Sequence, residues 1–159
     1  MNHKSFLRNL ILFLSFLLIS FTACRKDDVC TDDGTPDLKI KFFDAGNHAT
    51  EKSVDTLYVI ALPGQDTLVS GETEVSGLSI PLNVNTDISE FIFATQHNND
   101  TMIFHYTRET VFVSKACGYK MIFHQLNVNL QPDNDNWIKQ IDIINHDVVS
   151  DTTHLKIYH

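Results

Sequence analysis

Apolar and polar residues alternate in short runs along most of the chain, with the two-residue period of a half-buried β-strand. Leu38, Ile40 and Phe42 form one apolar face of the first such run. No helical period persists over a dozen residues after the N-terminal apolar run. Turn residues such as Pro63-Gly64 separate the runs. The pattern predicts strands at residues 38–43, 56–62, 67–69, 78–84, 89–96, 101–107, 110–116, 119–130, 137–144 and 153–158.

Short strands at such close spacing predict an all-β fold, an antiparallel β-sandwich of about seven to nine strands. The connections are expected to follow an immunoglobulin-like or Greek-key style. The immunoglobulin signature itself does not fit, because Trp137 follows the second of the two later cysteines instead of lying between them. We expect one sandwich domain over residues 38–159, preceded by a polar tether over residues 24–37. Pro81 predicts an edge strand or a bulge within residues 78–84.

The longest predicted strand, residues 119–130, divides into two faces. One carries Ile122, His124, Leu126, Val128 and Leu130, and we expect this face to line the core, with His124 inside it or at its margin. Aromatic side chains are expected to fill much of the remaining core. They include Phe91, Phe93, Phe104, Tyr106 and Phe112.

The N-terminus has a different pattern. Lys4 and Arg8 precede a twelve-residue apolar run, Leu10 to Phe21, which is too short to cross a bilayer as a helix. Small residues and Cys24 follow it. Residues 1–23 therefore resemble a bacterial lipoprotein signal peptide, although Phe21 stands where that family usually has Leu. The resemblance implies that Cys24 is lipidated; an ordinary signal peptide with a free Cys24, or a short membrane anchor, is the alternative.

The residues after Cys24 bear on the location. Lys26, Asp27 and Asp28 resemble the surface-export signal of some Gram-negative lipoproteins. The resemblance implies an outer-membrane protein displayed on the cell surface. The alternatives are a merely solvated charged tether and a position on the periplasmic face.

The net charge of the chain limits the classes of molecule that it can bind directly. Without residues 1–23 the chain keeps 136 residues, with ten basic and twenty acidic side chains, a net charge of −10. This acidity argues against nucleic acid and against anionic lipid as direct partners.

With Cys24 acylated, Cys30 and Cys117 remain, an even number in an oxidising compartment. We expect a disulfide between them, and two buried free thiols are the alternative. The bond would close a loop of 87 residues.

Catalytic and metal-binding motifs are absent from the sequence. It has no G-x-S-x-G, no H-E-x-x-H and no glycine-rich phosphate loop, so we expect no catalytic residues, metal site or cofactor. His105 and His124 lie on separate predicted strands, where they could meet across a sheet or be unrelated. Asp133 and Asp135 start like a calcium loop, but the required glycine is missing, which favours an exposed turn.

The pair Asp-Thr occurs four times, against about 1.3 expected by chance from the 15 Asp and 14 Thr. It resembles the acceptor of a periplasmic O-glycosylation system, which implies glycans on threonine. Turn chemistry at strand starts explains the same pairs, and the two interpretations are compatible. The candidate acceptors are Thr56, Thr67, Thr101 and Thr152.

Four motifs carry a wider resemblance. They are Cys30 ahead of Thr35-Pro36-Asp37-Leu38, Phe42-Phe43-Asp44, Tyr106-Thr107-Arg108, and Ala116-Cys117-Gly118-Tyr119. In these the chain resembles a family of uncharacterised small envelope lipoproteins from Gram-negative bacteria of the Bacteroidota type. The resemblance implies a secreted, disulfide-bearing domain with no assigned activity.

Two functions from different classes follow. The first is a non-catalytic envelope module that binds a protein or a glycan, or serves an outer-membrane assembly, anchored in the membrane by its N-terminal lipid. The second is a small metal-dependent or hydrolytic enzyme that acts on envelope polymers. The strand pattern and the missing catalytic motifs favour the first.

Overall fold

The computed structural model describes residues 29–159, and in this part of the chain the predicted all-β fold is confirmed. Cys24, Lys26, Asp27 and Asp28 lie outside the described residues. No helix in residues 29–159 is long and apolar enough to cross a membrane. The strands are β1 (Leu38–Phe43), β2 (Val54–Leu62), β3 (Asp66–Val75), β4 (Gly77–Ile80), β5 (Ile88–Ala94), β6 (Asn99–Ser114), β7 (Gly118–Leu130), β8 (Gln140–Ile143) and β9 (Leu155–Tyr158).

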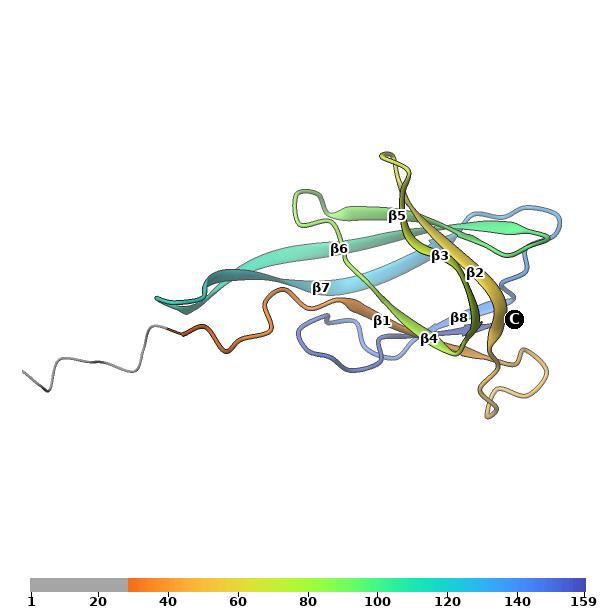
Figure 1. Ribbon diagram of the computed structural model, residues 1–159, viewed down its shortest axis with the longest axis horizontal. Helices are drawn as coiled ribbons and strands as arrows, with labels where there is room; N and C mark the ends of the chain where they lie inside the picture. The colour runs from red at the N-terminus through yellow and green to blue at the C-terminus, as the bar shows by residue number, and fades with distance from the viewer. Residues whose placement is uncertain (1–28) are drawn as a thin grey trace, which may run out of the picture. The chain divides into compact units, whose positions relative to one another are not determined.

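The nine strands within residues 29–159 form two sheets, as expected for a β-sandwich (Figure 1). The four-stranded sheet has the order β4-β1-β9-β8, and the five-stranded sheet has the order β3-β2-β5-β6-β7. The β1–β9 pair is parallel, with Ile40 opposite Leu155, whereas the other pairs with a defined register are antiparallel. The last strand thus lies beside the first one.

The chain forms two compact units. The sandwich core belongs to the unit made of Asp33–Phe112 and Tyr119–His159. The other unit contains the described residues 29–32 together with Val113–Gly118.

Alternating side chains from both sheets fill the core, as the apolar pattern predicts. Phe91 and Phe93 of β5 pack inward together with Phe104 and Tyr106 of β6. Phe112 was wrongly expected in the core, because it is 55% exposed. The largest fully buried side chains are Phe42, Phe93, Phe104, Phe123, Leu38, Ile40, Leu57, Ile80, Met102, Leu126, Ile138 and Leu155.

The expected core face of β7 is correct only in its second half. Leu126 is fully buried and Val128 and Leu130 pack against the core, but upstream the buried residue is Phe123 and not His124. Gln125 has a φ of 55°, in the left-handed region. One residue in this conformation shifts the alternation by one position, so the inward face changes between Phe123 and Leu126.

Several strand boundaries also differ from the prediction. The predicted strands 101–107 and 110–116 form one continuous strand, β6, and β3 extends well beyond the predicted 67–69 segment. Pairing along a neighbouring strand continues these elements through polar residues that have no periodic signal of their own. β4 ends at Ile80, immediately before Pro81, which has no amide hydrogen to donate to a sheet.

Candidate functional site

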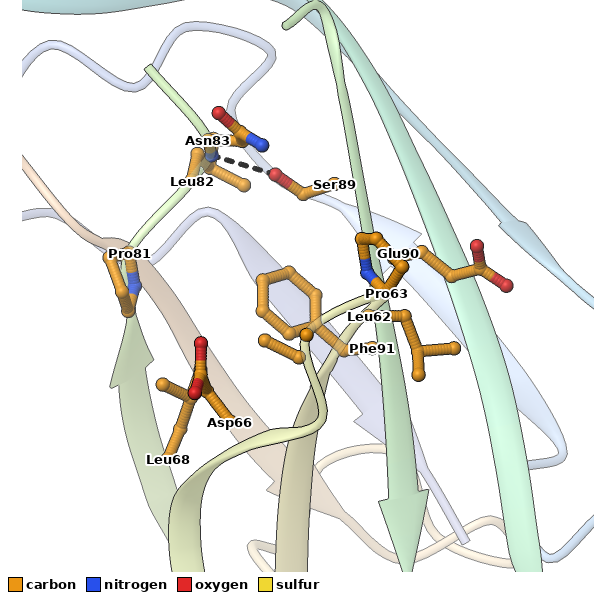
Figure 2. A pocket seen from close by; sticks show the side chains of 12 residues that line it. Leu62, Pro63, Asp66, Leu68, Pro81, Leu82, Asn83, Ser89, Glu90 and Phe91 are labelled. Carbon is orange, nitrogen blue, oxygen red and sulfur yellow. Dashed lines mark hydrogen bonds between the residues drawn. The ribbon is translucent and has the colours of Figure 1, made fainter. Parts of the chain in front are cut away.

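A hollow of about 340 Å³ opens between the two sheets of the sandwich. The chain passes from one sheet to the other at Ser76, between the edge strands β3 and β4. The hollow lies at the far ends of these strands, where the start of β3 faces the segment that follows β4 (Figure 2). It is therefore bordered by the β2–β3 turn on one side and by residues 81–83 on the other.

Most of the lining is apolar. Phe91 contributes a ring at the inner wall, and Leu68 lies closer to solvent. Figure 2 shows the Asp66 carboxylate on the inside of the hollow, whereas the Glu90 side chain points away from it. The lining among the described residues includes these two acids and no Lys or Arg. The full set is Ala61, Leu62, Pro63, Gly64, Asp66, Leu68, Pro81, Leu82, Asn83, Ser89, Glu90 and Phe91.

A closed ring of hydrogen bonds holds the 81–83 side of the hollow. The Asn83 amide donates to Ser89 Oγ at 2.8 Å, and the Tyr106 hydroxyl donates to the Asn83 carbonyl at 3.0 Å. Ser89 Oγ lies 2.7 Å from the Tyr106 hydroxyl oxygen, and since Tyr106 has only one proton, Ser89 is the donor in this pair. Burial raises the pKa of the Tyr106 phenol. Each member thus donates one hydrogen bond and accepts one.

Arg108 holds residues 84–87, which follow directly after the 81–83 side of the hollow. Its Nε donates to Asp87 Oδ1 at 2.6 Å, and its Nη1 donates to the Val84 carbonyl at 2.8 Å. The motif Tyr106-Thr107-Arg108 thus places two side chains against residues 83–87. These two residues and Ser89 make the rim a fixed part of the sandwich.

His124 does not meet His105. Its Nδ1 lies 2.9 Å from Asp147 Oδ1, and its Nε2 lies 3.1 Å from Glu109 Oε2. The hydrogen bond to Asp147, supported by the charges of Asp147 and Glu109, raises the pKa of the His124 imidazole. The carboxylates hold opposite edges of the ring, and within residues 29–159 no three metal-ligating side chains are grouped to hold an ion.

His154 is a buried histidine that the sequence analysis did not single out. Its Nδ1 accepts a hydrogen bond from the Lys39 amide at 3.0 Å, and its own amide donates to the Lys39 carbonyl at 2.9 Å. Burial lowers the pKa of this imidazole. The ring joins the end of the chain to the start of β1 and belongs to the structure of the sandwich.

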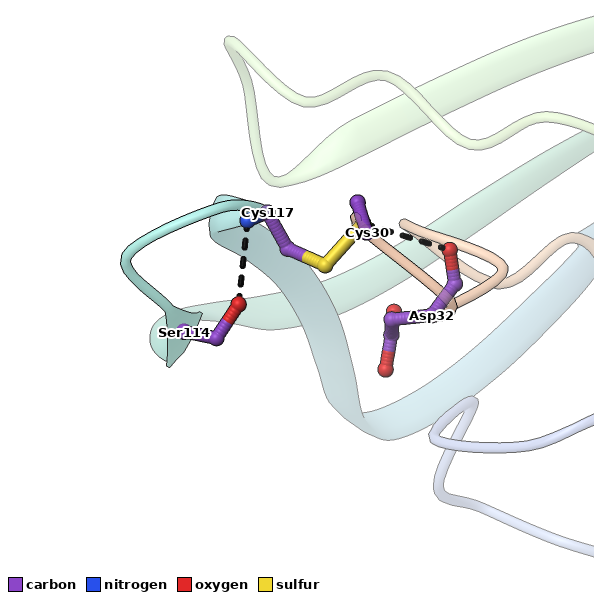
Figure 3. The surroundings of a disulfide bond; sticks show 4 residues. All are labelled: Cys30, Asp32, Ser114 and Cys117. Carbon is purple, nitrogen blue, oxygen red and sulfur yellow. Dashed lines mark hydrogen bonds between the residues drawn. A yellow bond between two sulfur atoms is a disulfide. The ribbon is translucent and has the colours of Figure 1, made fainter. Parts of the chain in front are cut away.

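The expected disulfide between Cys30 and Cys117 is present (Figure 3). The two Cα atoms lie 4.8 Å apart, and the bond joins residues 87 positions apart in sequence. The Cys117 amide donates to Ser114 Oγ at 3.0 Å, which closes the turn between β6 and β7. Cys117 is therefore held by both the disulfide and a hydrogen bond of its amide.

The four Asp-Thr pairs have different surroundings. Thr67 and Thr152 are exposed. Thr56 is half-buried, and its hydroxyl accepts a hydrogen bond from Gln96 at 3.0 Å. Thr101 follows the fully buried Asp100, whose Oδ2 accepts from the Ile138 amide at 2.7 Å. An enzyme that reads Asp-Thr on the folded chain would therefore reach Thr67 and Thr152 most easily.

The polar turn predicted around residues 133–136 is confirmed as a set of local hydrogen bonds. The Asp133 amide donates to Asn136 Oδ1, and the Asp135 amide donates to Asp133 Oδ1, both at 3.0 Å. These side chains cap their own turn, as Asp and Asn commonly do.

Comparison of the chain with known proteins identifies a family of unknown function. A model described as a family of unknown function, DUF6452, matches residues 56–159, which is more than half of the chain. No curated protein and no solved structure matches the chain. The chain therefore belongs to DUF6452, an uncharacterised family, in agreement with the uncharacterised domain that its motifs implied.

Proposed function

We propose that this member of DUF6452 is a non-catalytic interaction module of the Gram-negative envelope, anchored in the outer membrane by lipid on Cys24. The hollow between the sheets is its binding site for a protein partner. The observation that carries this proposal is the apolar lining around Phe91 with the Asp66 carboxylate on its inside.

The size and charge of the hollow select the partner. A volume of about 340 Å³ is at the small end for ligand sites and suits one or two side chains of a peptide segment. A Lys or Arg side chain can lay its methylene groups on the apolar wall while its charged end reaches Asp66. The negative charge of the chain attracts such a basic segment over a longer range.

The lining also favours binding over catalysis. Ser89 is the hydroxyl side chain in the hollow, and it both accepts from the Asn83 amide and donates to Tyr106. A serine nucleophile needs a general base at the same hydroxyl. The contacts of Ser89 instead hold the wall of the hollow in place.

A peptide-binding experiment tests this site. Labelled peptides that pair a Lys or Arg with a neighbouring Leu or Phe should bind the full chain, and peptides with Glu in place of the basic residue should not. We expect Asp66→Asn to weaken binding several-fold and added salt to weaken it further, since the contact is partly ionic and accessible to water. Asp135→Asn, an exposed acid outside the hollow, is the matched control.

Equal affinity for basic and acidic peptides, or equal losses in the two variants, would contradict the proposal. Selective binding of an envelope glycan in place of the peptides would assign the site to the other class of partner.

The anchor is proposed from the resemblance of residues 1–23 to a lipoprotein signal peptide. The intact mass of the chain purified from membranes should equal residues 24–159 plus acyl chains. Cys24→Ala should release the protein from the membrane fraction, because two or more acyl chains account for stable anchoring. A wild-type mass without acyl groups would rule out the anchor.

Display on the cell surface is proposed from Lys26, Asp27 and Asp28. Protease added to intact cells should degrade the domain, and replacing the two acids by Ala should protect it. A wild-type domain that stays intact until lysis would place the protein on the periplasmic face.

We also propose O-glycosylation, with Thr67 and Thr152 as the accessible acceptors. The mass of the chain should then exceed that of the acylated protein, and the excess should fall when Thr67 and Thr152 are replaced by Val. A mass fully explained by protein and acyl chains would leave turn chemistry as the only role of the Asp-Thr pairs.

A further inference from the structure

Two exposed aromatic rings flank the disulfide-bearing turn in sequence. Phe112 is 55% exposed and Tyr119 is 70% exposed, yet their rings pack against each other in a T-shaped pair with centroids 5.3 Å apart. Each belongs to the sandwich unit and comes immediately before or after residues 113–118. The pair therefore presents a preformed apolar surface on the outer part of β6 and β7.

The two most exposed large apolar residues in the described chain are Val29, at 75%, and Tyr119. Val29 directly precedes Cys30, and Tyr119 follows Cys117 by two positions. The exposed pair of Phe112 and Tyr119 is an apolar patch of the kind found at interaction sites.

Exposed aromatic rings are typical of segments that lie at a membrane interface, where the rings enter the headgroup region.

Covalent geometry keeps this segment close to the anchor. Cys30 follows Cys24 by six positions, the disulfide spans 4.8 Å between Cα atoms, and Tyr119 follows Cys117 by two positions. At up to about 3.6 Å per extended residue, Tyr119 lies no more than about 34 Å from Cys24 along this covalent path. Without the disulfide, the path along the chain would run through most of the domain.

We infer that Phe112 and Tyr119 insert into the lipid headgroup region of the membrane that holds Cys24, and so orient the domain on the bilayer. This inference rests on the proposed lipid anchor. The rings supply the apolar contact, and the disulfide keeps the tether short.

Depth-dependent fluorescence quenching tests the contact. The full lipidated chain is reconstituted in phosphatidylcholine vesicles, after Trp137→Phe has removed the only natural tryptophan. Phe112→Trp then reports from the aromatic pair, and Ile144→Trp is the matched control at a residue that is 54% exposed. Circular dichroism checks that both variants fold.

We expect the reporter at position 112 to emit at shorter wavelength in vesicles and to lose part of its emission when the lipids carry acyl chains brominated near the headgroup. The reporter at position 144 should keep its emission. Equal quenching at the two positions overturns the inference, as does an unquenched reporter at position 112. A blue shift without bromine quenching also overturns it, because the rings would then contact protein.

The anchor is tested separately by flotation of the same samples. Protein that floats with the vesicles but shows no quenching at position 112 overturns the membrane contact and leaves the anchor intact. Protein that does not float overturns both.

Discussion

Tyr106 is the residue on which the rim of the candidate site depends. Its hydroxyl is buried and takes part in the closed ring with Ser89 and the Asn83 backbone. A buried polar group that loses its partner is costly, because water cannot replace the missing hydrogen bond.

We therefore expect Tyr106→Phe to lower the free energy of unfolding by about 1–3 kcal/mol. Urea denaturation measures the loss. Tyr119→Phe is the matched control in lipid-free solution, where the exposed Tyr119 side chain contacts water, so its effect should stay within about 0.5 kcal/mol. Similar losses in the two variants would show that the ring of hydrogen bonds adds little.

His154 gives a prediction about pH. Burial lowers the pKa of its imidazole in the folded chain, whereas the unfolded chain has a pKa near 6.5. As the pH falls below about 6.5, the unfolded state binds a proton that the folded state excludes, so stability is lost. The loss continues until the folded-state pKa is reached.

His154→Gln retains an acceptor for the Lys39 amide and has no titration in this range. Its unfolding free energy should fall less than that of the wild type when the pH is lowered from about 7.5 to about 5.5. The difference between the two proteins isolates His154, since the other histidines titrate in both. Parallel pH curves would contradict the assignment.

Among the elements, β7 shows how one backbone conformation changes a face of a sheet. Gln125 is exposed and has a φ of 55°, which is unfavourable for any residue with a Cβ atom. Glycine adopts this conformation without steric cost, although it gains freedom in the unfolded chain.

We expect Gln125→Gly to raise the free energy of unfolding by up to about 1 kcal/mol, because relief of the left-handed strain exceeds the added chain entropy. Asn127→Gly, at an exposed position of the same strand, should instead lower it by about 0.5–1 kcal/mol. Thermal unfolding of the two variants measures the contrast. If both variants are less stable than the wild type, the left-handed conformation of Gln125 does not cost the folded state the expected free energy.

For the whole molecule, the disulfide is a covalent restraint over a long stretch of sequence. It joins residues 87 positions apart, and in the chain-entropy model such a closure stabilises the folded state by about 4–5 kcal/mol. That is a large fraction of the stability of a domain of this size.

Replacing Cys30 and Cys117 together by Ser should therefore lower the unfolding midpoint in urea sharply, and a reducing agent should have the same effect on the wild type. Ala116→Ser, which adds a hydroxyl beside the bond and leaves it intact, is the control. An unchanged midpoint in the double variant would show that the bond restrains a part of the chain that does not fold with the rest.

Sequence by itself determined the fold class, the strands that carry a clear period, the cysteine pair and the turn around residue 135. Each of these follows from local or compositional signals: alternation in β1 and β5, two cysteines that remain once Cys24 is assigned to lipid, and Asp and Asn side chains that bond to their own backbone. The expected anchor, surface display and glycosylation come from short motifs and remain predictions.

Only the tertiary structure decided the inward face of β7, the exposure of Phe112 and the hollow around Phe91. The face of β7 depends on the φ angle of Gln125, which no residue type near it requires. The hollow depends on two sheets whose edge strands, β3 and β4, bring residues far from Phe91 in sequence to its side. Periodicity reports which residues share a face, whereas packing between sheets depends on pairings over long sequence separation.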